Sequence, residues 1–196
     1  MRVLLSAFIL LFSLVFATDL NQAAEDFAEV YSLAYVSCKT INDNPEAKKE
    51  FCEAVETLER SLDNGSPEGL FAIGAYYASG ADKLVGKDNF LTFKWLNKAA
   101  EKGHAESLKF VGAMCLQGIG TLQDISKGVE YLESAGKKGD VSSYLILGSM
   151  YREGKYAPKN LAKAKEYYGF LCNSGEQIGC DLYRVVNEEI LFNKNK

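Results

Sequence analysis

Apolar residues recur at helical spacing in three similar stretches of the chain. These stretches are GLFAIGAYYASG at residues 69–80, SLKFVGAMCLQG at 107–118 and SYLILGSMYREG at 143–154. In the first stretch Leu70, Ile73 and Tyr77 lie three and four positions apart, which places them on one face of a helix. Each stretch also has a glycine six positions before its last glycine, namely Gly74, Gly112 and Gly148. A glycine within a helix costs about 1 kcal/mol relative to alanine, so its recurrence predicts close contact with a paired helix.

A second helical pattern follows each of these stretches. The three segments read FKWLNKAAEKG at 93–103, VEYLESAGKKG at 129–139 and KEYYGFLCNSG at 165–175. Asp88, Asp124 and Asn160 precede them at intervals of 36 residues, and their side chains suit the first turn of a helix. The closing glycines suit a helix C-cap. A single hairpin of this size cannot bury its apolar face, so the units must stack. The pattern predicts an all-α protein, an α/α solenoid of stacked helical hairpins.

The repeated motifs resemble the Sel1-like repeats, relatives of the tetratricopeptide repeat. The resemblance rests on the LG of LILGSMYREG, on WLNKAAEKG and on GHA at 103–105, and it covers about Gly65 to Cys180. We therefore expect Sel1-like repeats at 65–175. An atypical N-terminal helical hairpin is predicted at 18–64, and a C-terminal capping helix at 176–196.

The first 17 residues have the features of a signal peptide. Arg2 gives a positive start, an apolar run follows from Val3 to Phe16, and Val15 and Ala17 fit positions −3 and −1 of a cleavage site. An uncleaved N-terminal anchor is the alternative, although the run is short for a membrane span. Cleavage after Ala17 predicts a periplasmic or secreted protein with no membrane span, in a compartment where disulfides persist.

Composition excludes several functional classes. The chain has 196 residues, of which 47% are hydrophobic and 24% charged, with a net charge of −4. This is enough for one well-buried domain, and it gives no electrostatic reason to expect a nucleic acid as partner. The single histidine leaves little room for a histidine-based metal site. We predict no metal and no cofactor.

Two cysteines flank the segment CNSGEQIGC. In the repeat register, Cys172 takes the position of Gly136, and Cys180 takes that of Tyr144. A small residue and a large residue that pack across a turn are thus both cysteine, so a disulfide is geometrically plausible. Free thiols or a metal site are the alternatives. The chain is also similar to the Helicobacter cysteine-rich proteins, and this resemblance implies a disulfide at the same spacing across the repeat junction.

The other three cysteines lie outside this junction. Cys38 and Cys52 flank a predicted turn, and a bridge between them would tie down the N-terminal hairpin. Cys115 stands where other repeats have tyrosine, which predicts a buried free thiol, with a mixed disulfide or a dimer contact as the alternative.

The sequence has no assembled catalytic site. The similarity to the Helicobacter cysteine-rich proteins implies β-lactam binding or weak hydrolysis as an alternative function, and one SxxK motif is present, Ser134 to Lys137. Neither SDN nor KTG accompanies it, and both residues fall in solvent-side positions of the repeat. His104 is predicted to cap a helix rather than act as a base. We expect no catalytic residues, and any enzyme activity would be of the β-lactamase type.

The favoured function is a scaffold or adaptor that binds a protein or peptide of the cell envelope or of a host. By analogy with tetratricopeptide grooves, the first helices of the repeats would line a concave binding face. The candidate residues of this face are Phe71, Ala75, Ala78, Lys109, Ala113, Leu116, Leu145, Ser149 and Arg152. Their mixture of apolar and single cationic residues favours a peptide over a nucleic acid. The sequence does not identify the partner, the pathway or the oligomeric state.

Overall fold

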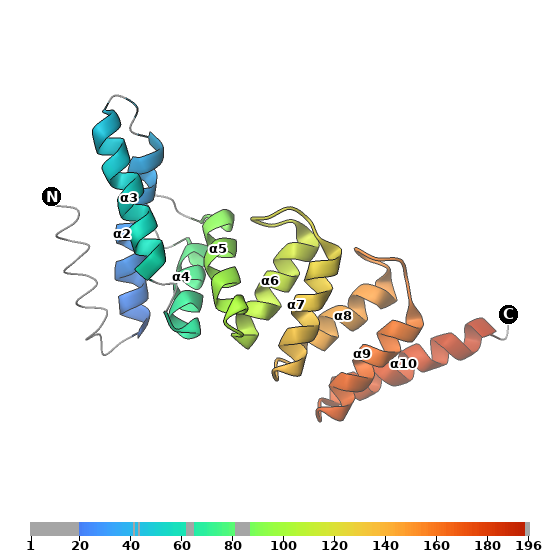
Figure 1. The fold of residues 1–196 in the computed structure, drawn as a ribbon. Coiled ribbons are helices and arrows are strands. Elements are labelled where there is room, and N and C mark those ends of the chain that lie inside the picture. Colours follow the sequence, from blue (N-terminus) through green and yellow to red (C-terminus); the bar gives the residue numbers. More distant parts are fainter. Residues whose placement is uncertain (1–19, 41, 43, 62–64, 81–86, 195–196) are drawn as a thin grey trace. The chain divides into compact units, whose positions relative to one another are not determined.

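The computed structural model describes residues 20–40, 42, 44–61, 65–80 and 87–194, and its regular structure in these ranges is α-helical. The helices are α2 (Leu20–Thr40), α3 (Pro45–Ser61), α4 (Pro67–Ser79), α5 (Asn89–Glu101), α6 (Ala105–Gln117), α7 (Ile125–Lys137), α8 (Ser142–Glu153), α9 (Leu161–Asn173) and α10 (Gln177–Lys194) (Figure 1). The all-α class and the succession of helical hairpins are therefore as predicted. The predicted signal peptide lies outside the described residues.

The predicted start signals of the second helices are confirmed. Asp88, Asp124 and Asn160 are the N-caps of α5, α7 and α9. Each side chain accepts a hydrogen bond from the amide three residues later, at 2.9–3.0 Å. Because these amides have no partner within the helix, a short polar side chain at this position determines where each helix begins.

The glycines within the first helices lie against the paired helix, as predicted. A Cβ atom on Gly74 would lie 2.7 Å from the side chain of Leu96, and one on Gly112 would lie 3.0 Å from the carbonyl oxygen of Gly128. A Cβ on Gly148 would collide with the ring of Tyr168. The missing side chain therefore sets the distance between the two helices of each hairpin.

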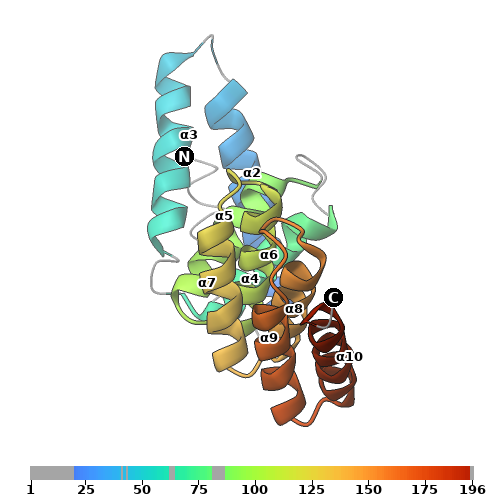
Figure 2. The same ribbon diagram turned by 90° about the vertical axis from the view of Figure 1, so that its right-hand side faces the viewer.

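The chain divides into two compact units, Met1–Lys102 and Gly103–Lys196. In the first unit α2 and α3 lie side by side in both views (Figures 1 and 2), and α4 packs on α2 and α5. Its core is aromatic: the ring of Trp95 meets those of Phe27 and Tyr31 edge to face, at centroid distances of 5.7 and 5.1 Å. Ser32 is buried and hydrogen-bonds the hydroxyl of Tyr77 at 2.7 Å.

The second unit contains two hairpins and a final helix. α6 pairs with α7, α8 with α9, and α10 packs on α9 (Figure 2). Its largest fully buried side chains are Tyr168, Leu116, Leu132, Leu147, Val111 and Val186. Leu147, on α8, and Val186, on α10, belong to one apolar cluster, so the final helix shares the core of the repeats.

Candidate functional site

A cavity of about 390 Å³ lies between α6 and α8, the first helices of two successive hairpins of the second unit. Its lining residues are Ala113, Leu116 and Gln117 of α6, Leu145, Ile146, Ser149, Met150 and Glu153 of α8, and Lys155 and Tyr156 of the turn that follows α8. The wall is mostly apolar; apart from Ser149 within α8, its polar groups lie at the ends of the helices and in the turn after α8. We refer to this cavity as the α6/α8 groove. Its size and lining suit one or two apolar side chains of a partner.

Four of the residues predicted for the binding face line this groove, namely Ala113, Leu116, Leu145 and Ser149. Leu116 is almost completely buried and forms the floor, whereas the other three are half-buried. Phe71, Ala75 and Ala78 lie on α4 in the first unit, where Ala75 is exposed and the other two are half-buried. The structure does not place Lys109 and Arg152 among the lining residues.

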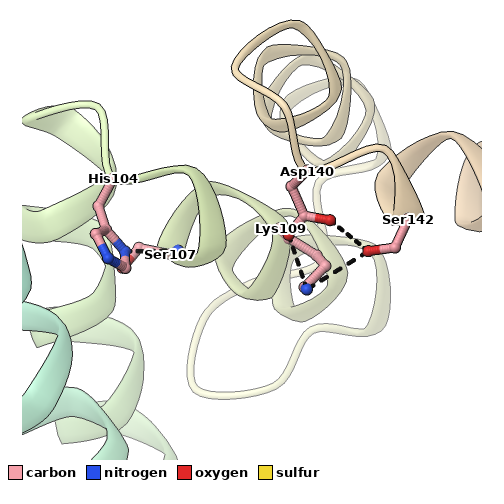
Figure 3. A network of polar contacts seen from close by, with 5 residues as sticks. All are labelled: His104, Ser107, Lys109, Asp140 and Ser142. Carbon is pink, nitrogen blue, oxygen red and sulfur yellow. Dashed lines mark hydrogen bonds and ion pairs between the residues drawn. The ribbon is translucent and has the colours of Figure 1, made fainter. Parts of the chain in front are cut away.

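Lys109 forms an ion pair inside the chain. Its Nζ lies 2.7 Å from Asp140, in the turn between α7 and α8, and 3.5 Å from the hydroxyl of Ser142 (Figure 3). The hydroxyl of Ser142 also donates to the Asp140 carboxylate. The side chain of Lys109 is 23% exposed and that of Asp140 13%. Asp140 therefore neutralises the charge of Lys109, and the ion pair connects α6 to the turn before α8.

Arg152 also forms an ion pair within the chain. Its Nε lies 3.6 Å from the carboxylate of Glu189 on α10, which also accepts a hydrogen bond from Lys159 at 2.8 Å. The hydrogen bond from Lys159 and the nearby positive charges outweigh partial burial and lower the pKa of Glu189. Both cations predicted for the binding face thus form ion pairs with acidic residues of the second unit. The sequence did not reveal these pairs, because the partners are far apart along the chain.

His104 is the N-cap of α6, as predicted. Its Nδ1 accepts from the backbone amide of Ser107 at 3.2 Å and lies 2.9 Å from the Ser107 hydroxyl (Figure 3). Asp140 occupies the equivalent position before α8, but its carboxylate is turned to Lys109. α8 consequently has no side-chain cap, and the buried hydroxyl of Ser143, the counterpart of Ser107, has no hydrogen-bond partner among the described residues.

Both predicted disulfides are present. Cys38 joins Cys52 between α2 and α3, with a Cα–Cα distance of 4.9 Å. Cys172 joins Cys180 between α9 and α10, at 4.5 Å. Cys115 is a buried free cysteine, and burial is the main cause that raises the pKa of its thiol. A buried neutral thiol in this position acts as a small apolar side chain.

Both residues of the SxxK motif lie on α7. Ser134 is half-buried and Lys137 exposed in α7. The adjacent Glu133 accepts a hydrogen bond from Tyr167 of α9 at 2.6 Å, so it serves helix packing. Within the described ranges, the structure shows no group of three or more His, Cys, Asp or Glu residues that could hold a metal ion. None of the described helices is long and apolar enough to cross a membrane.

The repeat geometry agrees with a known family. The Sel1 repeat matches residues 67–104, 105–140 and 141–175, which together make up more than half of the chain. The chain therefore belongs to the Sel1 repeat family. No curated protein sequence matches it at a significant level.

Two solved structures with TM-scores above 0.5 support the same fold. The protective antigen of uropathogenic Escherichia coli strains, which has an SLR fold, is 24% identical with a TM-score of 0.53, and the match covers 82% of this chain and 35% of the antigen's own length. A Sel1 repeat protein from Oxalobacter formigenes is 23% identical with a TM-score of 0.51, over 67% of this chain and 97% of that one. Cysteine rich protein B of Helicobacter pylori is 21% identical with a TM-score of 0.45, over 68% of this chain and 95% of that one.

Six residues that line the groove were not predicted. They are Gln117, Ile146, Met150, Glu153, Lys155 and Tyr156. The sequence could have indicated two of them. Gln117 and Glu153 occupy the same repeat position, each directly before the C-cap glycine of its helix. Ile146 and Met150 gave no signal, since only the helix packing decides which apolar residues of α8 face a cavity.

Proposed function

We propose that this protein is a scaffold that binds a protein or peptide partner through the α6/α8 groove. The observation that carries the proposal is the groove itself: an apolar cavity between the first helices of two Sel1 repeats, bordered by polar residues at the helix ends. Sel1-repeat folds are typical of protein–protein interaction. Apolar pockets with a polar border are where a partner's anchoring side chain gains most from burial.

The two disulfides fit a protein outside the cytoplasm, where thiols can be oxidised and remain paired. We place the mature protein in the periplasm or outside the cell, after cleavage of residues 1–17, with a partner in the cell envelope or a host. The residues predicted on α4 stay a candidate binding surface of the first unit by itself. The domain boundaries given by the sequence stay predictions.

The test compares two alanine-to-arginine variants. Ala113 is half-buried in the groove wall, whereas Ala162 is exposed on α9 outside it. We expect Ala113→Arg to remove the partners that the native protein captures by crosslinking in the native envelope, while Ala162→Arg retains them, as read by mass spectrometry. Capture that is equal in both variants would contradict the proposal. The variants avoid Lys109 and Arg152, whose replacement would break ion pairs within the chain.

The alternative function, β-lactam binding or hydrolysis, depends on the resemblance to the Helicobacter cysteine-rich proteins. Its test is independent of the groove: turnover of a chromogenic cephalosporin by purified protein, compared with a Ser134→Ala variant. Turnover that disappears in this variant would favour the hydrolase, and turnover no faster than in buffer removes it.

A further inference from the structure

Tyr156 has a backbone conformation that side chains rarely adopt. Its φ of 68° makes it the sole non-glycine residue with a positive φ in the part of the chain that the structure describes. A residue with a bulky side chain is strained in this region, and such strain persists only where the surroundings hold the residue in place. The positive φ of Tyr156 therefore needs a physical explanation.

The preceding repeat shows what this turn ordinarily requires. Gly120, 36 positions earlier, has a φ of 69°, so the same turn is built with glycine in one repeat and tyrosine in the next. Glycine adopts this conformation without strain. The third repeat thus keeps the geometry of the turn but adds an aromatic ring, and the ring borders the α6/α8 groove.

The lining of the groove has one acidic side chain, Glu153, and one basic side chain, Lys155. Lys155 lies over the ring of Tyr156, with its Nζ 5.0 Å from the ring centroid. Glu153 is exposed at the end of α8, and its carboxylate has no ion pair or hydrogen bond within the described ranges. Since the cations Lys109 and Arg152 are paired elsewhere, Glu153 is the acidic group of the lining that is available to a partner.

We propose that Tyr156 and Glu153 determine which partner the groove accepts: a peptide segment that inserts one large apolar side chain against Tyr156 and presents a neighbouring lysine or arginine to Glu153. This inference rests on the proposed function and names the chemistry of the partner. The apolar side chain is buried by Leu116, Leu145 and the Tyr156 ring. Gln117, at the same repeat position as Glu153, faces the groove with an amide that can bond to the peptide backbone.

A random heptapeptide library displayed on phage tests this inference. The library is selected on the mature protein with both disulfides intact, and peptides that also bind Ala113→Arg are discarded. We expect the remaining peptides to carry a large apolar residue beside lysine or arginine. Groove-dependent peptides without this pairing would overturn the inference and leave the proposed function standing. If Ala113→Arg binds every selected peptide, the proposed function fails as well.

The affinity of one selected peptide for variants of Tyr156 then tests the role of the tyrosine ring. Tyr156→Gly retains the turn geometry but removes the ring, and we expect binding at least about tenfold weaker. Tyr156→Phe keeps the ring and should bind like the native protein. The control Leu122→Gly alters an exposed side chain of the preceding repeat's loop and should have no effect. Unchanged affinity in Tyr156→Gly would overturn the role of Tyr156.

The charge contact is measured with a double-mutant cycle. Replacing the basic residue of the peptide by glutamine should weaken binding to the native protein by about two- to fivefold, and more at low salt, because the pair is exposed. The same replacement should have no effect on binding to Glu153→Gln. Equal losses in both proteins would show that Glu153 does not contact the basic residue.

Discussion

Two junctions of the second unit use the same repeat positions in different ways. Between α7 and α8, Gly136 lies against the ring of Tyr144, where an added Cβ would collide with the ring. Between α9 and α10 the equivalent residues, Cys172 and Cys180, form a disulfide. The first junction depends on packing, and the second is covalent. The backbone geometry that brings a small and a large side chain together is thus also suited to a disulfide.

The polar contacts of the two junctions differ as well. At the first junction Asp140 pairs with Lys109 of α6 at 2.7 Å. At the second, Glu176 takes the position of Asp140 but is exposed and makes no ion pair within the described ranges. The disulfide is therefore found where this polar contact between hairpins is missing.

The largest effect is expected from removing the covalent connection. Cys172→Ala combined with Cys180→Ala should lower the free energy of unfolding by about 2.5 kcal/mol, because the unfolded chain regains the entropy of a short closed loop. The amide protons of α10 should exchange faster, as measured by hydrogen exchange and mass spectrometry. The matched control is Cys38→Ala with Cys52→Ala, which alters α2 and α3 and should leave exchange in α10 unchanged. Unaltered protection of α10 in the first variant would contradict a stabilising role for its disulfide.

An intermediate effect is expected from converting the packed junction into a covalent one. Gly136→Cys combined with Tyr144→Cys should form a disulfide on oxidation, as detected by non-reducing peptide mapping. Loop closure contributes about 2.5 kcal/mol. Loss of the Tyr144 ring, which lies 5.2 Å from the ring of Phe170, removes about 0.5–1.5 kcal/mol. We therefore expect a net gain of about 1–2 kcal/mol.

The same double variant kept under reducing conditions is the control for this design, because it has both new side chains without the bridge, whereas Gly136→Cys alone would place its Cβ against the ring of Tyr144. Two thiols that remain free under oxidising conditions would show that the junctions differ in backbone geometry.

The smallest effect concerns the ion pairs that hold α10. The pKa of Glu189 is lowered in the folded protein from its ordinary value of 4.5, chiefly by the hydrogen bond from Lys159. Its contribution to stability is therefore present above about pH 4.5 and is lost as the pH falls through the lowered pKa. Glu189→Gln should reduce the free energy of unfolding by about 0.5 kcal/mol at pH 7, since the pair is partly exposed.

Denaturant unfolding at pH 7 and pH 3 measures this effect. The difference between the native protein and Glu189→Gln should vanish at pH 3. Glu188→Gln is the matched control, because Glu188 is exposed and makes no ion pair in the described part of the chain. A difference that is the same at both pH values would exclude the carboxylate charge as its cause.

Much of the fold followed from local signals in the sequence. The capping residue Asp124 and the internal glycine Gly112 recur at one period, and each acts through the nearest turn or the paired helix. The cysteine pair of the last junction could be placed because the repeat register assigns each residue a packing position. The candidate site was predicted only in part. The register indicated Ala113 and Ser149, but it also selected Lys109, which the structure pairs with Asp140.

The sequence by itself predicted the helices, most of their caps, the family and the cysteine pair of the last junction, because these depend on short-range capping and on a repeated packing register. Only the tertiary structure decided which side chains are available to a partner. The acidic partners of Lys109 and Arg152 come from distant turns or helices, and the groove exists only where α6 and α8 lie together. Tyr156 shows the same limit: its sequence position marks a turn, but its strained backbone and its place at the groove depend on how the second unit packs.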